Sequence, residues 1–282
     1  MRFQQSFVFS LIPALAVAIT PPNVDGMTIV WSEDFEGPAG ASPDGNAWNI
    51  MDAINTNDEL QTYTTSNKNL QISGGGTIQF VPHKSPSGLW TSGRIETKGS
   101  WTPAPGKVTK IAANILLGSN SFLEKQGIWP AFWALGDAMR HGTQWPEAGE
   151  IDIFEQVNGL PTGYGTLHCA TGTTNPCLEP IGRKGTVIMP TDGFHVWSVT
   201  IDRTNDDWTQ QTISWQLDGN TFTTTTGAQI GDAATWSALA HSPLYLILNV
   251  AVGGDWPGAP NALTSDGYGS MMEVQWVSVY SS

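Results

Sequence analysis

Short strand-like runs recur along nearly the whole chain, and turn residues separate them. The 282 residues include 31 Gly and 18 Pro, which are the strongest local signals for turns. No segment keeps the 3.6-residue hydrophobic period of a long helix. Because many short strands bounded by turns are typical of sandwiches and barrels, the sequence predicts an all-β fold of two packed antiparallel sheets, a sandwich or jelly roll.

The predicted strands are rich in β-branched and aromatic residues. They cover residues 28–34, 69–82, 93–98, 111–117, 128–135, 150–156, 165–168, 195–202, 212–217, 244–252 and 272–280. Asp218-Gly219 between two apolar runs predicts a tight hairpin turn. Five of the 13 tryptophans sit in strand patterns and are expected in the core: Trp31, Trp48, Trp197, Trp215 and Trp276.

The charge of the chain argues against nucleic-acid binding. The formal net charge is -13, with only 12 Lys and Arg residues. Such a chain lacks the basic surface that holds phosphates, so neither DNA nor RNA is expected as a partner. We interpret the acidity as a solubility feature of an extracellular protein.

The first 18 residues match a secretory signal peptide. Arg2 supplies the positive charge, residues 7–18 form a short apolar run, and Ala16-Val17-Ala18 fits the small-x-small cleavage pattern. The alternative is a membrane anchor, but the run is shorter than the roughly 20 apolar residues of a spanning helix. Residues 19–282 are then expected to form one domain of a secreted, monomeric protein without a membrane partner.

Two cysteines, Cys169 and Cys177, are the only ones in the chain. In an oxidising compartment they are expected to pair and close a small loop, whereas two free buried thiols are the alternative. A metal site is disfavoured because His168 is the only further ligand nearby. We therefore expect neither a metal nor a cofactor.

Three carboxylates lie within six residues of one predicted strand, at Glu150, Asp152 and Glu155. A solvated surface strand could carry such a pattern. The intervening Ile and Phe residues instead favour a central strand, where a buried charge is costly unless it is paired or used.

Strand geometry makes this segment more specific. Glu150 and Asp152 face the same side of a regular strand, and Glu155 faces the other. A β-bulge near residues 153–154 would return Glu155 to the first side. The two glutamate backbones would then lie roughly 13 Å apart. Side chains leaning together would bring the carboxyl groups toward the roughly 5–5.5 Å of a retaining glycosidase, with Asp152 between them.

The motif Glu-x-Asp-x-x-Glu and its surroundings resemble glycoside hydrolase family 16, specifically laminarinase-like endo-β-1,3(4)-glucanases. The resemblance extends over nearly the whole chain after the signal peptide, from about residue 31 to residue 280, and six further segments carry it. They are Trp-Ser-Glu-Asp-Phe (31–35), Glu-Leu-Gln-x-Tyr-Thr (59–64), Gly-Arg-Ile-Glu (93–96), Trp-Pro-Ala-Phe-Trp (129–133), Trp-Pro-Glu-Ala-Gly (145–149) and Leu-Asn-Val-Ala-Val-Gly-Gly (248–254).

The resemblance implies a concanavalin-like jelly roll with a cleft on its concave face. It also implies that Glu150 is the nucleophile, that Glu155 is the acid/base, and that Asp152 assists Glu150. The residues themselves do not decide which glutamate has which role.

A glucan cleft needs aromatic side chains for the apolar faces of the sugars and polar groups for their hydroxyls. Trp129, Trp133, Trp145 and Trp256 are the aromatic candidates, with core packing as the alternative for each. The resemblance adds His168, Arg94, Glu59, Asn57 and Gln156 as polar candidates, for which structural hydrogen bonding or ion pairing is the alternative.

Three questions remain open at the level of sequence. A transglycosylase of the same fold would use the same carboxylates, and relatives acting on galactans share the motif. A non-catalytic glucan-binding protein is disfavoured because both glutamates are intact.

Many relatives bind Ca²⁺ through an Asp in the last strand, where this chain has the neutral Gln275, so no tight calcium site is expected. The expected partner is a β-glucan polysaccharide.

Overall fold

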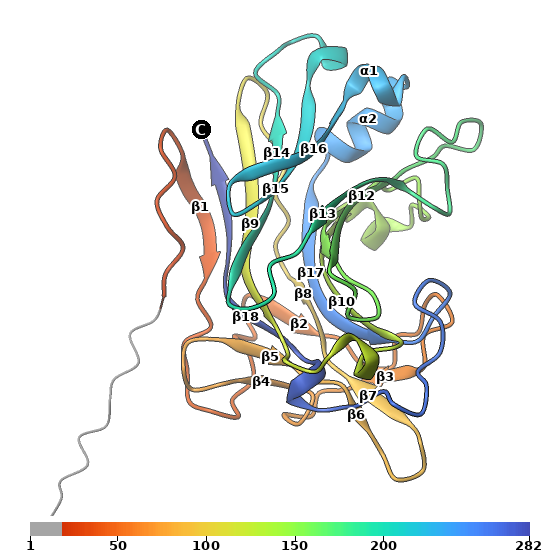
Figure 1. Ribbon diagram of the computed structural model, residues 1–282. Coiled ribbons are helices and arrows are strands. Elements are labelled where there is room, and N and C mark those ends of the chain that lie inside the picture. Colours follow the sequence, from red (N-terminus) through yellow and green to blue (C-terminus); the bar gives the residue numbers. More distant parts are fainter. Residues whose placement is uncertain (1–18) are drawn as a thin grey trace, which may run out of the picture.

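Two large curved antiparallel sheets lie face to face in the computed structural model, which describes residues 19–282 (Figure 1). The predicted signal peptide lies outside the described residues. This arrangement confirms the predicted jelly-roll sandwich. Among residues 19–282, no helix is both long enough and apolar enough to span a bilayer.

The first sheet has eight strands, and β1 joins it by pairing with β18. In spatial order its other strands are β16 (Asn220–Thr226), β15 (Thr212–Leu217), β14 (His195–Asp202), β9 (Val108–Leu117), β18 (Met272–Ser281), β5 (Ile78–Phe80) and β4 (Leu70–Ile72). β1 covers Thr28–Glu33.

The second sheet has seven strands and carries the candidate carboxylates. Its spatial order is β13 (Arg183–Ile188), β12 (Thr162–His168), β11 (Glu150–Glu155), β10 (Ile128–Gly136), β17 (Leu244–Val252), β8 (Arg94–Thr97) and β2 (Trp48–Ile50). The motif strand β11 is therefore an inner strand, paired with β10 and β12.

Smaller elements close the ends of the sandwich. A three-stranded sheet contains β3 (Gln61–Tyr63), β7 (Trp90–Ser92) and β6 (His83–Lys84), and its β3–β7 pair is parallel. The α-helices of the described chain are short: α1 (Gly227–Ile230) and α2 (Ala233–Ala240). Single 3₁₀ turns are η1 (Phe122–Glu124), η2 (Asp137–His141), η3 (Trp208–Gln210) and η4 (Tyr268–Ser270).

Four of the five tryptophans predicted for the core are buried, and Trp31 is half-buried. Trp197 and Trp215 are each 1% exposed and belong to the main core, where Trp197 packs on Phe154 of β11 with ring centroids 4.5 Å apart. Trp48 is also buried, and the half-buried Trp31 packs against its ring. Trp276 is buried in a separate small cluster. The large aromatic area that these side chains remove from water stabilises the sandwich.

Each predicted strand segment contains or overlaps an observed strand. The predicted hairpin also forms, since Asp218 and Gly219 connect β15 and β16 with φ of 49° and 79°. Two successive positive φ angles match the type I′ turn that Asp-Gly favours. The sequence did not reveal β2, β3, β6, β7 or β13, because these strands are short or carry polar residues and glycine.

Candidate active site

A cleft of about 650 Å³ lies on the seven-stranded sheet, within the range typical of ligand sites. Its wall includes Arg94 of β8, Trp133 of β10, Asp152 of β11 and Asn249 of β17. Their strand neighbours Ile95, Phe132, Ile151 and Leu248 belong to the hydrophobic core. Because successive side chains alternate across a strand, the cleft lies on the face turned away from the other sheet.

A β-bulge in β11 brings all three motif carboxylates to this face. Phe154 pairs with Phe132 of β10 and Asp152 pairs with Trp133, so Ile153 has no partner on β10. The β11–β12 register shifts at the same place. The bulge predicted near residues 153–154 is therefore confirmed, and Glu150, Asp152 and Glu155 all line the cleft.

Glu155 is 6% exposed and accepts a hydrogen bond from Nε1 of Trp129 at 2.9 Å. Burial raises its pKa from 4.5 to about 7, although the Trp129 bond and the charge of His168 act in the other direction. A carboxyl group with a pKa near neutrality can both donate and accept a proton at working pH.

Glu150 and Asp152 lie beside each other on the same side of β11. Burial raises the pKa of Glu150, whereas the charge of His168 and a hydrogen bond from Trp145 lower it. Burial, followed by the charges of Glu155 and Glu150, raises the pKa of Asp152 well above its ordinary value. The backbone carbonyl of Asp152 accepts a 2.7 Å hydrogen bond from Trp215 Nε1, which ties the bulged strand to the core.

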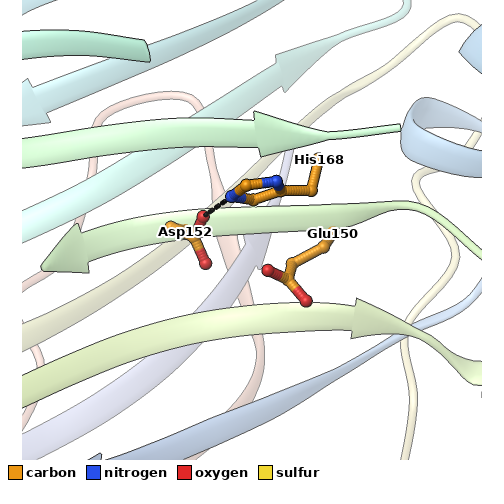
Figure 2. Close-up of side chains that lie close together, drawn as sticks. All are labelled: Glu150, Asp152 and His168. Atoms are coloured by element: carbon orange, nitrogen blue, oxygen red, sulfur yellow. Dashed lines mark ion pairs between the residues drawn. The ribbon is translucent and has the colours of Figure 1, made fainter. Parts of the chain in front are cut away.

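His168 faces these carboxylates from the neighbouring strand β12, where it pairs with Glu150 (Figure 2). Its Nε2 lies 3.6 Å from Oδ2 of Asp152, and its Nδ1 lies 2.6 Å from Oε2 of Glu179. Burial lowers the pKa of His168, but the hydrogen bond to Glu179 and the surrounding carboxylates outweigh burial and raise it.

The donor atoms of Glu150, Asp152 and His168 all lie within 4.8 Å of one another (Figure 2). Carboxylates and imidazole are donors that many divalent ions accept. We interpret the cluster as acid–base groups instead, because it lines one cleft together with Glu155, a further carboxyl group with a raised pKa. The absence of a metal stays a prediction.

Aromatic side chains form the wall of the cleft around these carboxylates. Trp256 meets Trp129 and Tyr164 edge to face, with ring centroids 5.5 and 4.9 Å apart. The ring centroids of Trp145 and His168 lie 5.6 Å apart. Trp145 is 43% exposed and Trp256 is 38% exposed, so both present open ring surface for stacking.

Polar candidates lie at the β8 and β17 side of the cleft. Glu59 is buried and accepts hydrogen bonds from Gln61 and Tyr63, at 2.6 and 3.3 Å, and from Asn57 at 3.4 Å. Arg94 forms a 2.7 Å ion pair with Glu96, and its guanidinium lies 5.0 Å from the Trp133 ring centroid. These contacts fix the orientations of the polar groups before any ligand arrives.

Of the predicted binding residues, eight line the cleft: Trp129, Trp133, Trp145, Trp256, His168, Arg94, Glu59 and Asn57. Gln156 does not. It follows Glu155 directly in the chain, so its side chain points to the other side, where Nε2 donates to the carbonyl of Leu160. The predicted contact between Gln156 and substrate therefore has no support in the cleft.

Sequence reasoning missed several residues that shape the site. Asn249 accepts a 2.8 Å hydrogen bond from Trp133 Nε1, and Lys184 lies near the rings of Tyr164 and Trp256. Asn249 had a usable signal, since it is a lone amide in the fully buried strand β17. Glu179 had none, because it lies in a loop without periodicity.

The two cysteines form the predicted disulfide between Cys169 and Cys177, directly after β12. Gln275 accepts a 2.5 Å hydrogen bond from Asn114 of β9. This neutral pair offers no carboxylate oxygen at Gln275, and the expected absence of a tight calcium site stays a prediction.

Comparisons with known proteins agree with this geometry. A family model described as "XgeA-like, catalytic GH16 domain" matches residues 120–192, which include the whole carboxylate motif. A β-glucanase of Rhodothermus marinus is 31% identical over 262 residues, covering 89% of this chain and 84% of the relative. Glucan endo-1,3-β-glucosidase A1 of Niallia circulans is 29% identical across 93% of this chain, which spans only 39% of that longer protein.

The solved endo-1,3-β-glucanase of Streptomyces sioyaensis has a similar fold. Its TM-score is 0.86 at 33% identity, with 93% of this chain and 98% of that chain covered. The similarity therefore extends over both sheets.

Proposed function

The chain belongs to glycoside hydrolase family 16, and on this basis we propose that it is a retaining endo-glycosidase of β-1,3-glucan or mixed β-1,3/1,4-glucan. The observation that carries the proposal is the bulge in β11, which turns Glu150 and Glu155 into the same cleft. Relatives named as endo-1,3-β-glucanases support the substrate class and the endo mode of action.

In the proposed mechanism, Glu150 and Glu155 act in two displacements. A carboxylate oxygen of Glu150 attacks the anomeric carbon while Glu155 donates its proton to the leaving glycosidic oxygen. The ionised Glu155 then takes a proton from water, whose oxygen displaces Glu150 and releases a product with retained configuration. The pKa of about 7 at Glu155 suits this alternation.

Asp152 supports the nucleophile in this proposal. Its raised pKa follows from burial and from the charges of Glu155 and Glu150. Asp152 can therefore hold a proton at its position between the two glutamates. A protonated Asp152 would donate a hydrogen bond to Glu150 and leave Glu150 as the ionised attacking group.

The test compares wild type, Glu150→Gln and Glu155→Gln on laminarin, mixed-linkage β-glucan and a galactan. We expect wild type to release oligosaccharides from one or both glucans and both variants to lose activity by about 10²-fold or more. The exposed Glu147→Gln beside the motif is the matched control and should behave as wild type. Full activity in Glu150→Gln would remove the assigned nucleophile.

Product analysis separates the mechanistic alternatives. Proton NMR of early products from laminarin should show the β-anomer first, and an initial α-anomer would contradict the retaining assignment. Accumulation of oligosaccharides longer than the substrate would instead indicate transglycosylation.

We also propose that the protein is secreted as a monomer after removal of residues 1–18. The charged start, apolar run and Ala16-Val17-Ala18 pattern support export. N-terminal sequencing of protein from culture medium should begin near Ile19, and light scattering of that protein should give the mass of one chain.

A further inference from the structure

A loop closed by the disulfide follows β12 and leads directly to Glu179. The Cys169–Cys177 bond fixes the base of this loop next to His168. Asn175 then holds the end of the loop, because its Oδ1 accepts the backbone N–H of Glu179 at 2.7 Å and its Nδ2 donates to the Glu179 carbonyl at 3.2 Å. The backbone of Glu179 is thus held from both sides.

The Glu179 carboxylate uses both oxygens on the end of β12. Oε2 lies 2.6 Å from Nδ1 of His168, and Oε1 accepts the backbone N–H of Cys169 at 2.7 Å. An ionised carboxylate can only accept hydrogen bonds, so Nδ1 of His168 must carry a proton. The imidazole is thereby oriented with Nε2 toward Asp152.

Asp152 presents an oxygen that this arrangement can use. Its Oδ2 is buried and has no hydrogen-bond partner in the described part of the chain. A buried unpartnered oxygen is costly. His168 Nε2 lies 3.6 Å away, just beyond hydrogen-bond length, so a small shift of either side chain would close the contact (Figure 2).

We propose that Glu179 is a positioning residue which, from the disulfide-closed loop, keeps His168 in its protonated, Asp152-facing state during glucan hydrolysis. The inference rests on the proposed function. In this proposal the loop contributes to catalysis because its Glu179 carboxylate keeps the positive charge of His168 beside the nucleophile Glu150.

The charges around His168 give this task a physical reason. Facing groups are Glu150, Asp152 and Glu155 from β11, Glu179 from the loop, and Lys184 from β13 in the cleft wall. The charge of His168 lowers the pKa of Glu150, against burial and against the smaller effect of the Glu179 charge, which both raise it. A protonated His168 therefore favours the ionised form that a nucleophile needs, and loss of its proton would favour a neutral, unreactive Glu150.

The chain contains a close match to this pair in the other sheet, outside the cleft lining. His195 Nδ1 lies 2.7 Å from Oδ2 of Asp218, and Oδ1 of Asp218 accepts the backbone N–H of Val196 at 2.8 Å. The carboxylate again binds a histidine and the residue after it. Asp218→Asn is therefore a matched control for Glu179→Gln.

The experiment is ¹⁵N NMR of the full-length mature enzyme with labelled histidines, together with kinetics on the glucan that wild type cleaves. In wild type, His168 should keep both ring protons through neutral pH. In Glu179→Gln the pKa of His168 should fall, and each unit below the assay pH cuts the protonated fraction about tenfold. We expect kcat at neutral pH to fall about tenfold, with KM within about twofold and the alkaline limb of the pH profile moved to lower pH.

Asp218→Asn should change the resonances of His195 and leave kcat and the pH profile as in wild type. An unchanged His168 titration in Glu179→Gln overturns the inference. If that variant does not fold, the wild-type spectrum decides, because the loss of either ring proton at neutral pH is incompatible with the proposed state. A wild type that cleaves no glucan would refute the proposed function, while the NMR result would still test the inference.

Discussion

Nε1 of Trp129 lies 2.9 Å from Oε1 of Glu155 and donates a hydrogen bond to it from the neighbouring strand. This bond stabilises the charged carboxylate and lowers its pKa, whereas burial raises the pKa to about 7. Trp129 therefore lines the cleft and also limits how far burial raises the pKa of Glu155, the proposed acid/base.

Replacing this tryptophan should move the pH profile. Trp129→Phe keeps an aromatic ring but removes the N–H, so the pKa of Glu155 should rise and the alkaline limb of kcat/KM should move up by about one pH unit. Trp256→Phe is the control, since Trp256 packs on Trp129 and has no hydrogen bond to Glu155. A shift of equal size in both variants would show that packing, not the hydrogen bond, is responsible.

Glu155 is expected to be required for activity but to lower the stability of the fold near neutral pH. Burial raises its pKa from 4.5 to about 7. The stability that the group contributes is therefore complete below the unfolded pKa and is lost as pH rises through the folded pKa. Glu155→Gln should gain stability relative to wild type between about pH 5 and 8, by on the order of 3 kcal/mol at most.

Urea unfolding of both proteins across this pH window checks the prediction. The exposed Glu147→Gln is the surface control for the loss of one carboxyl group. A stability difference for Glu155→Gln that stays constant with pH would mean that Glu155 has no raised pKa in the folded protein.

The motif strand shows how far sequence reasoning reaches. Alternation alone places Glu155 on the wrong side of the strand, and requiring a shared face predicts the bulge that the register confirms at Ile153. The core positions of Trp197 and Trp215 follow from the same period-two pattern. Local rules thus predict strands, faces and the position of the carboxylates.

These local rules do not predict contacts between loops and strands. Glu179 meets His168 because the disulfide and Asn175 fold the intervening loop back, and no periodic pattern encodes that path. The strand β13 was missed because its alternating exposure is carried by residues such as Lys184 and Gly185, which have weak strand preference. Gln156 lies outside the cleft lining because it directly follows Glu155 in the strand and points to the opposite face.

A glycine in β12 allows a core tryptophan to support the motif strand. A Cβ at Gly165 would lie 2.4 Å from Cδ1 of Trp215, whose indole donates to the backbone carbonyl of Asp152. Gly165→Ala should therefore displace that indole and cost about 1–3 kcal/mol through overpacking. Activity should fall as well, because the bulge loses its anchor.

Thermal unfolding and glucanase assays of Gly165→Ala test this coupling. Gly45→Ala is the control, since a Cβ there meets nothing within 4 Å. Wild-type stability in Gly165→Ala would show that Trp215 can move without cost.

Reduction of the disulfide should weaken both the fold and the site. Cys169 and Cys177 are eight residues apart, and closing so short a loop is worth about 2–3 kcal/mol in the chain-entropy model. The released loop should also loosen Glu179 and lower kcat more than it raises KM. Urea unfolding and kinetics with and without reductant measure both effects. The double variant Cys169→Ala/Cys177→Ala should resemble the reduced enzyme, and its stability and kcat should not change when reductant is added. A loss of stability without any loss of kcat would show that the loop does not contribute to catalysis.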